Sequence, residues 1–229
     1  MPRPIAATIH MGALRHNLQR MREAANGRTL WAVVKANAYG HGLLRAARAF
    51  EAADGLAMID LCDAQKVREQ GWKKRILLLE GFFDATDIPL LEKYDIETIV
   101  HNRHMIELLK AQAPYASLKV HIKINSGMNR LGFLPQEEEE IRAQLQTIQG
   151  VQVMGVVTHF ANAEPTYGHE RPATVSIQLN RMDKIQPMPK NLCMANSAAT
   201  LWQSDVKGDA VRAGVALYGV SPDSHYTSA

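Results

Sequence analysis

Lys35 is the residue with the clearest chemical potential, because it closes a short apolar run, Trp31–Lys35. A lysine whose stem is buried at the end of a strand is costly as an isolated ammonium unless it is paired, neutral or covalently used. One interpretation is therefore a Schiff-base lysine, whose ammonium has become an imine. The other is a lysine that extends from the strand end into water, as most lysines do. The residues that follow Lys35 favour the first interpretation.

The turn after Lys35 is typical of an anion-binding loop. Tyr39-Gly40-His41-Gly42 is a tight, glycine-flanked turn into a helix, in which the backbone can approach a phosphate and the Tyr39 hydroxyl can donate to it. Ser197 and Gly214 follow later strands, and phosphate sites in α/β barrels frequently use the loops after strands seven and eight. Ser197 is also suited to cap the helix that follows it, and the two roles are compatible.

Two further strand ends carry polar side chains. Arg130 lies in Ser126–Gly132, between two glycines, where it could hold a carboxylate with two hydrogen bonds or form a surface ion pair. His159 emerges from the buried run Val151–Thr158. A lone histidine there is either a structural hydrogen-bonding group or a catalyst.

The elements that must position these residues are short apolar runs alternating with amphipathic segments. We expect strands at Trp31–Lys35, Gly55–Ile59, Ile76–Leu79, Glu97–Val100, Lys119–Ile124, Val151–Thr158, Asn191–Ala195 and Asp209–Ala213. This alternation predicts a mainly parallel sheet covered by helices. Eight units in 229 residues favour a closed (β/α)8 TIM-like barrel over an open doubly wound sheet.

In such a barrel the active site lies at the C-terminal ends of the strands, where all the candidate residues fall. A phosphate anchor opposite a buried lysine is the combination that pyridoxal 5′-phosphate (PLP) requires. The sequence therefore predicts a PLP-binding α/β barrel.

Composition excludes several other classes of protein. The chain is 46% hydrophobic and 21% charged, unlike a disordered or fibrous chain, and its net charge of +3 includes no basic block that would indicate nucleic-acid binding. Cys62 and Cys193 lack metal-ligand spacing, so we expect neither a metal site nor a disulfide framework. We recognise no signal peptide or membrane-spanning run and expect a soluble, cytoplasmic protein.

Taken together, these segments resemble those of the bacterial alanine racemases, PLP-dependent enzymes with an N-terminal α/β barrel. The matching segments are Ala32-Val33-Val34-Lys35-Ala36-Asn37-Ala38-Tyr39-Gly40-His41-Gly42, Leu77-Leu78-Leu79-Glu80-Gly81-Phe82-Phe83, Ser126-Gly127-Met128-Asn129-Arg130-Leu131-Gly132, Thr158-His159-Phe160, Asn196-Ser197, Val211-Arg212-Ala213-Gly214 and Leu217-Tyr218-Gly219. They occur in the family's order, and the first and third are highly specific.

The resemblance implies a role for each matched position. Lys35 resembles the lysine that forms the aldimine and acts as the base on one face of the substrate carbanion. Arg212 resembles the residue facing the pyridine nitrogen. Because a guanidinium keeps its proton, that nitrogen would stay unprotonated and the carbanion would remain concentrated at Cα. The positions resembling cofactor-binding residues are Lys35, Tyr39, His159, Asn196, Ser197, Arg212, Gly214 and Val215.

The same resemblance extends to the substrate side of the site. Arg130 resembles an arginine near the substrate carboxylate, and Lys123 resembles a lysine that is carbamylated in some relatives to orient that arginine. His159 resembles a histidine that stacks on the cofactor ring. Lys35, Arg130 and His159 form the expected catalytic set.

The family also implies partners and further domains. Its members interconvert L-alanine and D-alanine for cell-wall synthesis as homodimers, with no nucleic-acid or membrane partner, and carry a β-rich second domain with the opposite-face tyrosine base. No segment here matches that domain. We therefore expect residues 1–10, with a strand-like piece at Ala7–His10, to pack with it, residues 11–219 to form the barrel, and residues 220–229 to begin a linker. The barrel alone is expected to bind PLP and to turn over poorly.

Other functions fit parts of the pattern. A stand-alone PLP-binding barrel that buffers the cofactor without catalysis has a similar length. The motifs around Tyr39 and Arg130, however, match those of the racemases more closely. An amino-acid decarboxylase on the same fold and a barrel enzyme that uses no PLP are the remaining alternatives.

Overall fold

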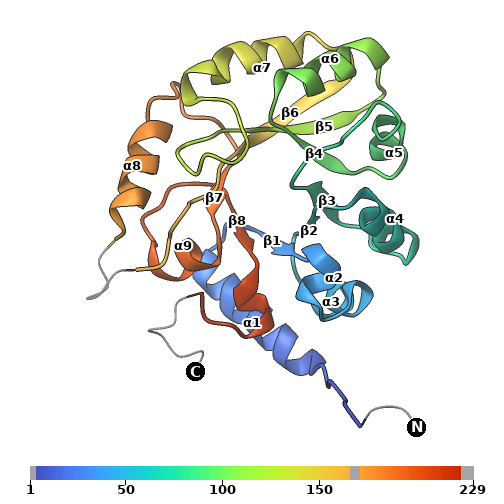
Figure 1. Cartoon of the computed structure of the whole chain (residues 1–229), viewed down its shortest axis with the longest axis vertical. Helices are drawn as coiled ribbons and strands as arrows, with labels where there is room; N and C mark the ends of the chain where they lie inside the picture. The colour runs from blue at the N-terminus through green and yellow to red at the C-terminus, as the bar shows by residue number, and fades with distance from the viewer. Residues whose placement is uncertain (1–3, 166–170, 223–229) are drawn as a thin grey trace.

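The computed structural model describes residues 4–165 and 171–222, and these form a closed barrel of eight parallel strands (Figure 1). The strands are β1 (Thr29–Val33), β2 (Gly55–Met58), β3 (Arg75–Leu78), β4 (Glu97–Val100), β5 (Leu118–Lys123), β6 (Val151–Val157), β7 (Leu192–Ala195) and β8 (Ala210–Ala213). Each pairs with the next, and β8 closes the barrel on β1. The predicted barrel is confirmed, and the strand bounds differ from the predicted ones by at most two residues.

Helices connect the strands and lie outside them (Figure 1). They are α1 (Met11–Ala25), α2 (Lys35–Tyr39), α3 (Leu43–Ala49), α4 (Leu61–Glu69), α5 (Ile88–Lys93), α6 (Arg103–Gln112), α7 (Glu138–Gln146), α8 (Ala173–Met182) and α9 (Ser197–Trp202), with short 3-10 helices η1 (Pro135–Glu137) and η2 (Val215–Tyr218). Within the described residues, none of the helices is long and apolar enough to cross a membrane.

The core is divided into two layers by the barrel wall. Alternate strand residues point inward, where Trp31, Val33 and Leu77 belong to a small cluster inside the barrel. The opposite faces of the strands pack against the helices in a larger cluster. In α1, the apolar residues spaced one helical turn apart, from Leu14 to Ala25, are buried in this larger cluster, as the sequence pattern predicts.

A partly buried ion-pair network lies at the N-terminal end of the barrel, where Glu97 and His121 are buried and the Arg75 side chain is 41% exposed. Arg75 on β3 donates to both carboxylate oxygens of Glu97 on β4, at 2.5 and 2.7 Å, and stacks over the Trp31 ring. His121 Nε2 on β5 lies 2.7 Å from Glu97 Oε2. The network ties three neighbouring strands together at the end of the barrel opposite the predicted active site.

The N-terminal segment differs from the prediction. Residues 5–10 have no regular secondary structure, whereas the sequence pattern predicts a strand at Ala7–His10. The segment runs away from the barrel before α1 (Figure 1), and Ile5 is 80% exposed. A strand needs a hydrogen-bonding neighbour, and within the described residues no other segment pairs with this one.

Candidate active site

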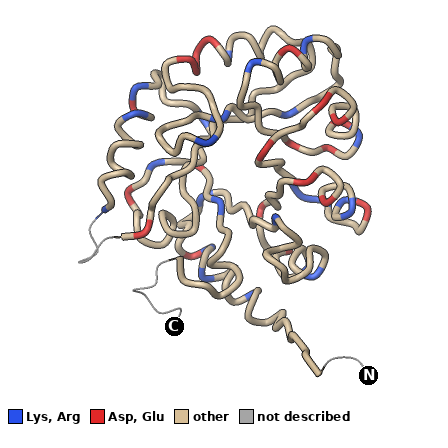
Figure 2. Tube along the Cα trace, viewed as in Figure 1, with Lys and Arg blue, Asp and Glu red and all other residues tan. Residues whose placement is uncertain are grey.

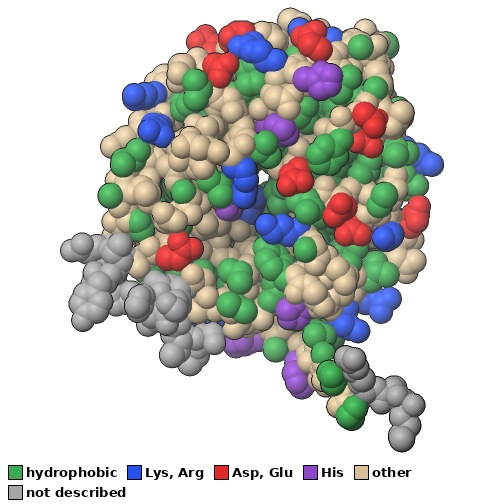
Figure 3. All heavy atoms as spheres, in the orientation of Figure 1, with side chains coloured by type: hydrophobic (Ala, Val, Ile, Leu, Met, Phe, Trp, Pro, Cys, Tyr) green, Lys and Arg blue, Asp and Glu red, His purple; other side chains and the backbone are tan. Residues whose placement is uncertain are grey.

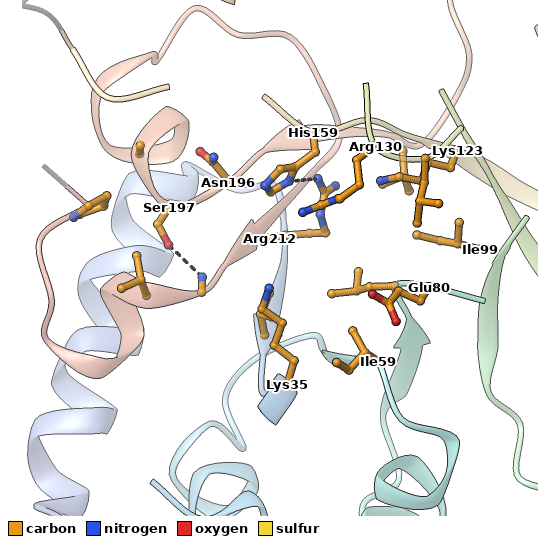
Figure 4. Close-up of a pocket in the computed structure, with 18 of the residues that line it drawn as sticks. Lys35, Ile59, Glu80, Ile99, Lys123, Arg130, His159, Asn196, Ser197 and Arg212 are labelled. Atoms are coloured by element: carbon orange, nitrogen blue, oxygen red, sulfur yellow. Dashed lines mark hydrogen bonds between the residues drawn. The ribbon is translucent and has the colours of Figure 1, made fainter. Parts of the chain in front are cut away.

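A cavity of about 220 Å³ opens among the C-terminal ends of the strands (Figure 4). All ten residues predicted to form the site line it, and these are Lys35, Tyr39, Lys123, Arg130, His159, Asn196, Ser197, Arg212, Gly214 and Val215. Lys123 lies on β5 and Arg212 on β8, and the other eight lie in the segments that follow β1, β5, β6, β7 and β8. The fold therefore brings together side chains up to 180 residues apart in the sequence.

Lys35 lies just beyond β1, not at its end as the sequence pattern predicts. The strand stops at Val33, and Lys35 begins α2, a short turn whose next four residues, from Ala36 to Tyr39, all have φ between 52° and 56°. Left-handed backbone is unfavourable for these residues and persists only where other contacts fix it. Here Asn37 Oδ1 accepts from the Leu43 N–H, and the Asn37 carbonyl accepts from the Gly42 N–H. The turn leaves Lys35 half-buried on the cavity wall.

Tyr39, Ser197 and Gly214 meet on one side of the cavity. A Cβ added to Gly214 would lie 2.7 Å from the Tyr39 hydroxyl oxygen, so only glycine allows this approach. Ser197 Oγ accepts from the Gly214 N–H at 2.8 Å (Figure 4). The predicted capping role of Ser197 is wrong, because the side chain of Asn196 caps α9 by accepting from the Ala199 N–H. Ser197 is the first residue of α9, and its hydroxyl instead bonds to Gly214 in the loop after β8.

Arg212 crosses the floor of the cavity and is only 5% exposed. Its guanidinium donates to the carbonyl oxygens of Cys193 and Thr158 and to Cys193 Sγ. It also lies 3.4 Å from His159 Nδ1 (Figure 4). Because a guanidinium has no acceptor, His159 Nδ1 must be the acceptor, and a neutral His159 carries its proton on Nε2.

Burial and positive neighbours keep His159 neutral. Desolvation, followed by the charges of Arg212, Lys123, Arg130 and Lys35, lowers the pKa of His159 to about 2. The histidine is therefore a neutral ring beside the arginine over the whole physiological pH range.

Lys123, at the end of β5, is buried among cations. Desolvation and the charges of Arg212 and Arg130 lower its pKa from 10.5 to about 7. A lysine in this state carries a substantial fraction of neutral, nucleophilic amine near neutral pH.

Arg130 lies in a tightly folded loop between β5 and η1. The Asn125 side chain accepts from the backbone N–H groups of Gly127 and Asn129, and the Phe133 N–H donates to the Lys123 carbonyl. Gly132 has φ 122°, and a Cβ there would lie 2.7 Å from the Asn125 nitrogen. The loop places the exposed Arg130 side chain at the cavity, beside Lys123 and Arg212 (Figure 4).

Three residues around the site were not singled out from the sequence. Glu80 and Glu164 are the acidic side chains on the cavity wall within the described residues. Glu80 lies two residues after the end of β3, so the expectation that active-site residues follow the C-terminal ends of the strands could have identified it. Tyr218 donates to the Val33 carbonyl, a contact across 185 residues that no local pattern encodes, and its ring lies 4.7 Å from the Tyr39 ring.

The cavity is lined by more positive than negative side chains. Figure 2 shows basic residues around the centre of the barrel, whereas acidic and basic residues are mixed on the outer helices. In Figure 3, lysine, arginine and histidine side chains border the central hollow, together with an acidic side chain and hydrophobic ones. In residues 4–165 and 171–222, no three His, Cys, Asp or Glu side chains are grouped so that they could hold a metal ion. The donor set suits an anionic ligand.

Comparisons with known proteins point to one family. The family model for the alanine racemase N-terminal domain matches residues 9–222. The alanine racemase of Delftia acidovorans is 46% identical over 227 residues, and the catabolic alanine racemase of Klebsiella aerogenes is 45% identical over 226 residues. The alignments cover 97% and 99% of this chain but 61% and 62% of the two relatives.

Solved structures agree. The biosynthetic alanine racemase from Pseudomonas aeruginosa matches 95% of this chain and 60% of its own, with a TM-score of 0.89 and 33% identity. The alanine racemase from Bacillus anthracis with bound L-Ala-P matches with a TM-score of 0.79 and 29% identity, over 96% of this chain and 61% of its own. The chain belongs to the alanine racemase family and corresponds to its N-terminal domain.

Proposed function

We propose that this chain is the cofactor-binding barrel of a PLP-dependent alanine racemase. The observation that carries the proposal is that Lys35, the Tyr39–Ser197–Gly214 contact and Arg212 line one cavity. Such a cavity offers an amine for an aldehyde, an anion-binding corner formed by Tyr39, Ser197 and Gly214, and a fixed cation.

The residues present fit this cofactor. Tyr39, Ser197, Gly214 and Val215 would hold the phosphate, through the hydroxyls of Tyr39 and Ser197 and the backbone N–H of Val215 at the start of η2, where a helix leaves its first N–H groups without intrahelical partners. Because Gly214 has no Cβ, the Tyr39 hydroxyl can lie close to the backbone to which Ser197 is bonded, so the polar groups of the three residues converge at one side of the cavity. When bound, PLP supplies an electrophilic carbon for amines and a conjugated ring that withdraws electrons from the substrate Cα.

Lys35 and Arg212 would then divide the proton chemistry. Lys35 would serve one face of the substrate Cα: as a general base it would take the proton from one enantiomer, and as a general acid it would deliver a proton to that face when the other enantiomer reacts. Arg212 keeps its proton, so no proton is delivered to a ring nitrogen that faces it. Charge would stay at Cα, where reprotonation gives the amino acid back.

Arg130 and His159 would orient the bound groups. Arg130 would hold the substrate carboxylate, and the neutral His159 ring would pack against the cofactor. We also propose that Lys123, whose pKa is lowered to about 7, is carbamylated and orients Arg130.

The chain spans about 60% of the length of the curated relatives it matches. We propose that the complete enzyme is a homodimer and that a β-rich domain outside this chain supplies the proton donor for the other face. Residues 11–219 would then be the barrel, residues 1–10 would pack with that domain, and residues 220–229 would lead towards it.

Binding and turnover can be tested separately. The purified chain should bind PLP in a visible-absorbance titration and should bind pyridoxal, which lacks the phosphate, at least about tenfold more weakly. Equal affinity for the two would contradict the phosphate site. The chain alone should produce little or no D-alanine from L-alanine, whereas the complete enzyme should racemise it. Robust production by the chain alone would refute the division between domains.

A further inference from the structure

Gln178 is a buried amide on the outer helix α8, and it contacts the loops after two strands. The side chain is only 2% exposed. Its Nε2 donates to Ser126 Oγ at 2.8 Å and to the His159 carbonyl at 2.9 Å, while its Oε1 accepts from the Ala161 N–H at 2.9 Å. Both ends of the amide are thus engaged, and a buried amide in this state is expensive to replace.

A chain of hydrogen bonds continues from Gln178 into the barrel wall, and each member donates to the next. Thr158 Oγ1 donates to the Ile124 carbonyl at 2.8 Å, so its single proton is used there. The Ser126 hydroxyl must then donate to Thr158 Oγ1, at 2.8 Å, and its oxygen accepts from Gln178. Ser126 is fully buried and Thr158 nearly so. Such a chain of satisfied bonds fixes each member against the next.

The network joins the two segments that carry Arg130 and His159. Ser126 begins the loop that carries Arg130, and Arg181, also on α8, donates to the Ser126 carbonyl at 3.2 Å. On the other side, Thr158 and Ala161 flank His159, whose own carbonyl is bonded to Gln178. In the part of the chain that the structure describes, Gln178 is the side chain that hydrogen-bonds to both segments from outside the barrel.

We propose that Gln178 is a positioning residue, which fixes the Arg130 loop and His159 relative to each other. The inference rests on the proposed function, in which Arg130 faces the substrate and His159 faces the cofactor. Gln178 lines neither the cavity nor the anion-binding corner. Its effect therefore passes through the two segments that it joins.

The test compares variants with a matched control. Gln178→Leu removes all three hydrogen bonds, and Gln178→Glu keeps the volume and the Ala161 contact but lacks the two donors. Ser126→Ala cuts the network with a smaller change. Val175→Ala is the control, because Val175 is a fully buried core residue of the same helix and has no part in the network.

Two readouts are needed. The first is ¹⁵N NMR relaxation of the backbone amides of Arg130 and His159, measured on the chain without PLP. We expect fast motion to increase in both segments together in the Gln178 and Ser126 variants and to stay at the wild-type level in Val175→Ala. The second is the visible circular dichroism per bound PLP, which we expect the Gln178 variants to reduce by at least half.

The outcomes separate the two proposals. Wild-type relaxation in Gln178→Glu and Ser126→Ala, or a change confined to α8, would overturn the positioning role, as would dichroism equal to that of Val175→Ala. Failure of the wild-type chain to bind PLP would overturn the proposed function, and the relaxation readout would still decide whether Gln178 holds the two segments. If Gln178→Leu does not fold, the other two variants decide.

Discussion

At the scale of single residues, burial and neighbouring charge set the protonation states on which the proposed chemistry depends. The pKa of Lys123 is lowered to about 7 and that of His159 to about 2, in each case by desolvation first and then by nearby cations. Burial raises the pKa of Tyr39, which keeps its hydroxyl protonated. The cavity therefore presents a neutral imidazole and a phenol that can donate, next to two permanent guanidinium charges on Arg130 and Arg212.

Lys123 should react with carbon dioxide, because a carbamate forms only on a neutral amine. Incubation with ¹³C-bicarbonate should give a carbamate signal by NMR near pH 8, and the signal should weaken as the pH falls below about 7 and the amine becomes protonated. Lys123→Met should abolish the signal. Lys119→Met, on the same strand but paired with Asp95 at the surface, should retain it. A signal that survives in Lys123→Met would show that another amine is the site.

At the scale of elements, the turns that follow the strands depend on backbone geometry more than on side-chain type. The loop after β5 folds back so closely that Gly132 lies against the backbone of Lys123, Ile124 and Asn125. The turn after β1 uses left-handed residues to aim Lys35 at the cavity.

Gly132→Ala tests the first of these turns. The new Cβ meets backbone atoms at 2.7 to 2.8 Å, and φ 122° is unfavourable for alanine, so we expect a loss of about 1–3 kcal/mol in the free energy of unfolding. Gly12→Ala is the control, because its Cβ would meet nothing within 4 Å on α1, and helix propensity predicts a gain of up to about 1 kcal/mol. Urea denaturation measures both. An unchanged Gly132→Ala would mean that the loop adapts freely.

Glu97 tests the ion-pair network among β3, β4 and β5. Although desolvation opposes it, bonding to Arg75 and His121 lowers the pKa of Glu97 from 4.5 to about 2. The unfolded chain binds the proton more readily, so the stabilisation is present above pH 4.5 and is lost as the pH falls towards 2. Glu97→Gln should destabilise the chain by about 1–3 kcal/mol at pH 7 and by less at pH 3, because the partly exposed Arg75 left behind can be solvated.

Glu107→Gln is the matched control, because Glu107 pairs with Lys110 on the surface of α6. It should change the free energy of unfolding by less than about 0.5 kcal/mol at either pH. Equal effects of the two substitutions would show that the Glu97 network contributes no more than a surface pair.

At the scale of the whole molecule, strand periodicity predicted the barrel, and the expectation that chemistry lies at the C-terminal strand ends predicted Lys35, Tyr39, Arg130, His159, Ser197 and Gly214 at the cavity. Lys123, Asn196, Arg212 and Val215 were predicted from the family resemblance and line the same cavity. The sequence did not predict the left-handed turn after β1, the Asn196 cap or the Tyr218 contact with Val33. The Tyr218 contact depends on atoms that closure of the barrel brings together. The turn after β1 and the Asn196 cap are local, but residue types alone do not predict four left-handed residues in a row or decide between the neighbouring cap candidates Asn196 and Ser197. The same limit applies to Gln178, which has the sequence appearance of an ordinary helical residue and becomes significant only through its three buried bonds.

The most direct test of the account is to trap the cofactor on its lysine. The chain is saturated with PLP, reduced with borohydride, digested and mapped by mass spectrometry, with Lys35→Ala treated in parallel. We predict one pyridoxyl group per chain, on the peptide that contains Lys35, and its loss in Lys35→Ala. Label on Lys123 or spread over surface lysines, with Lys35 unmodified, would contradict the account.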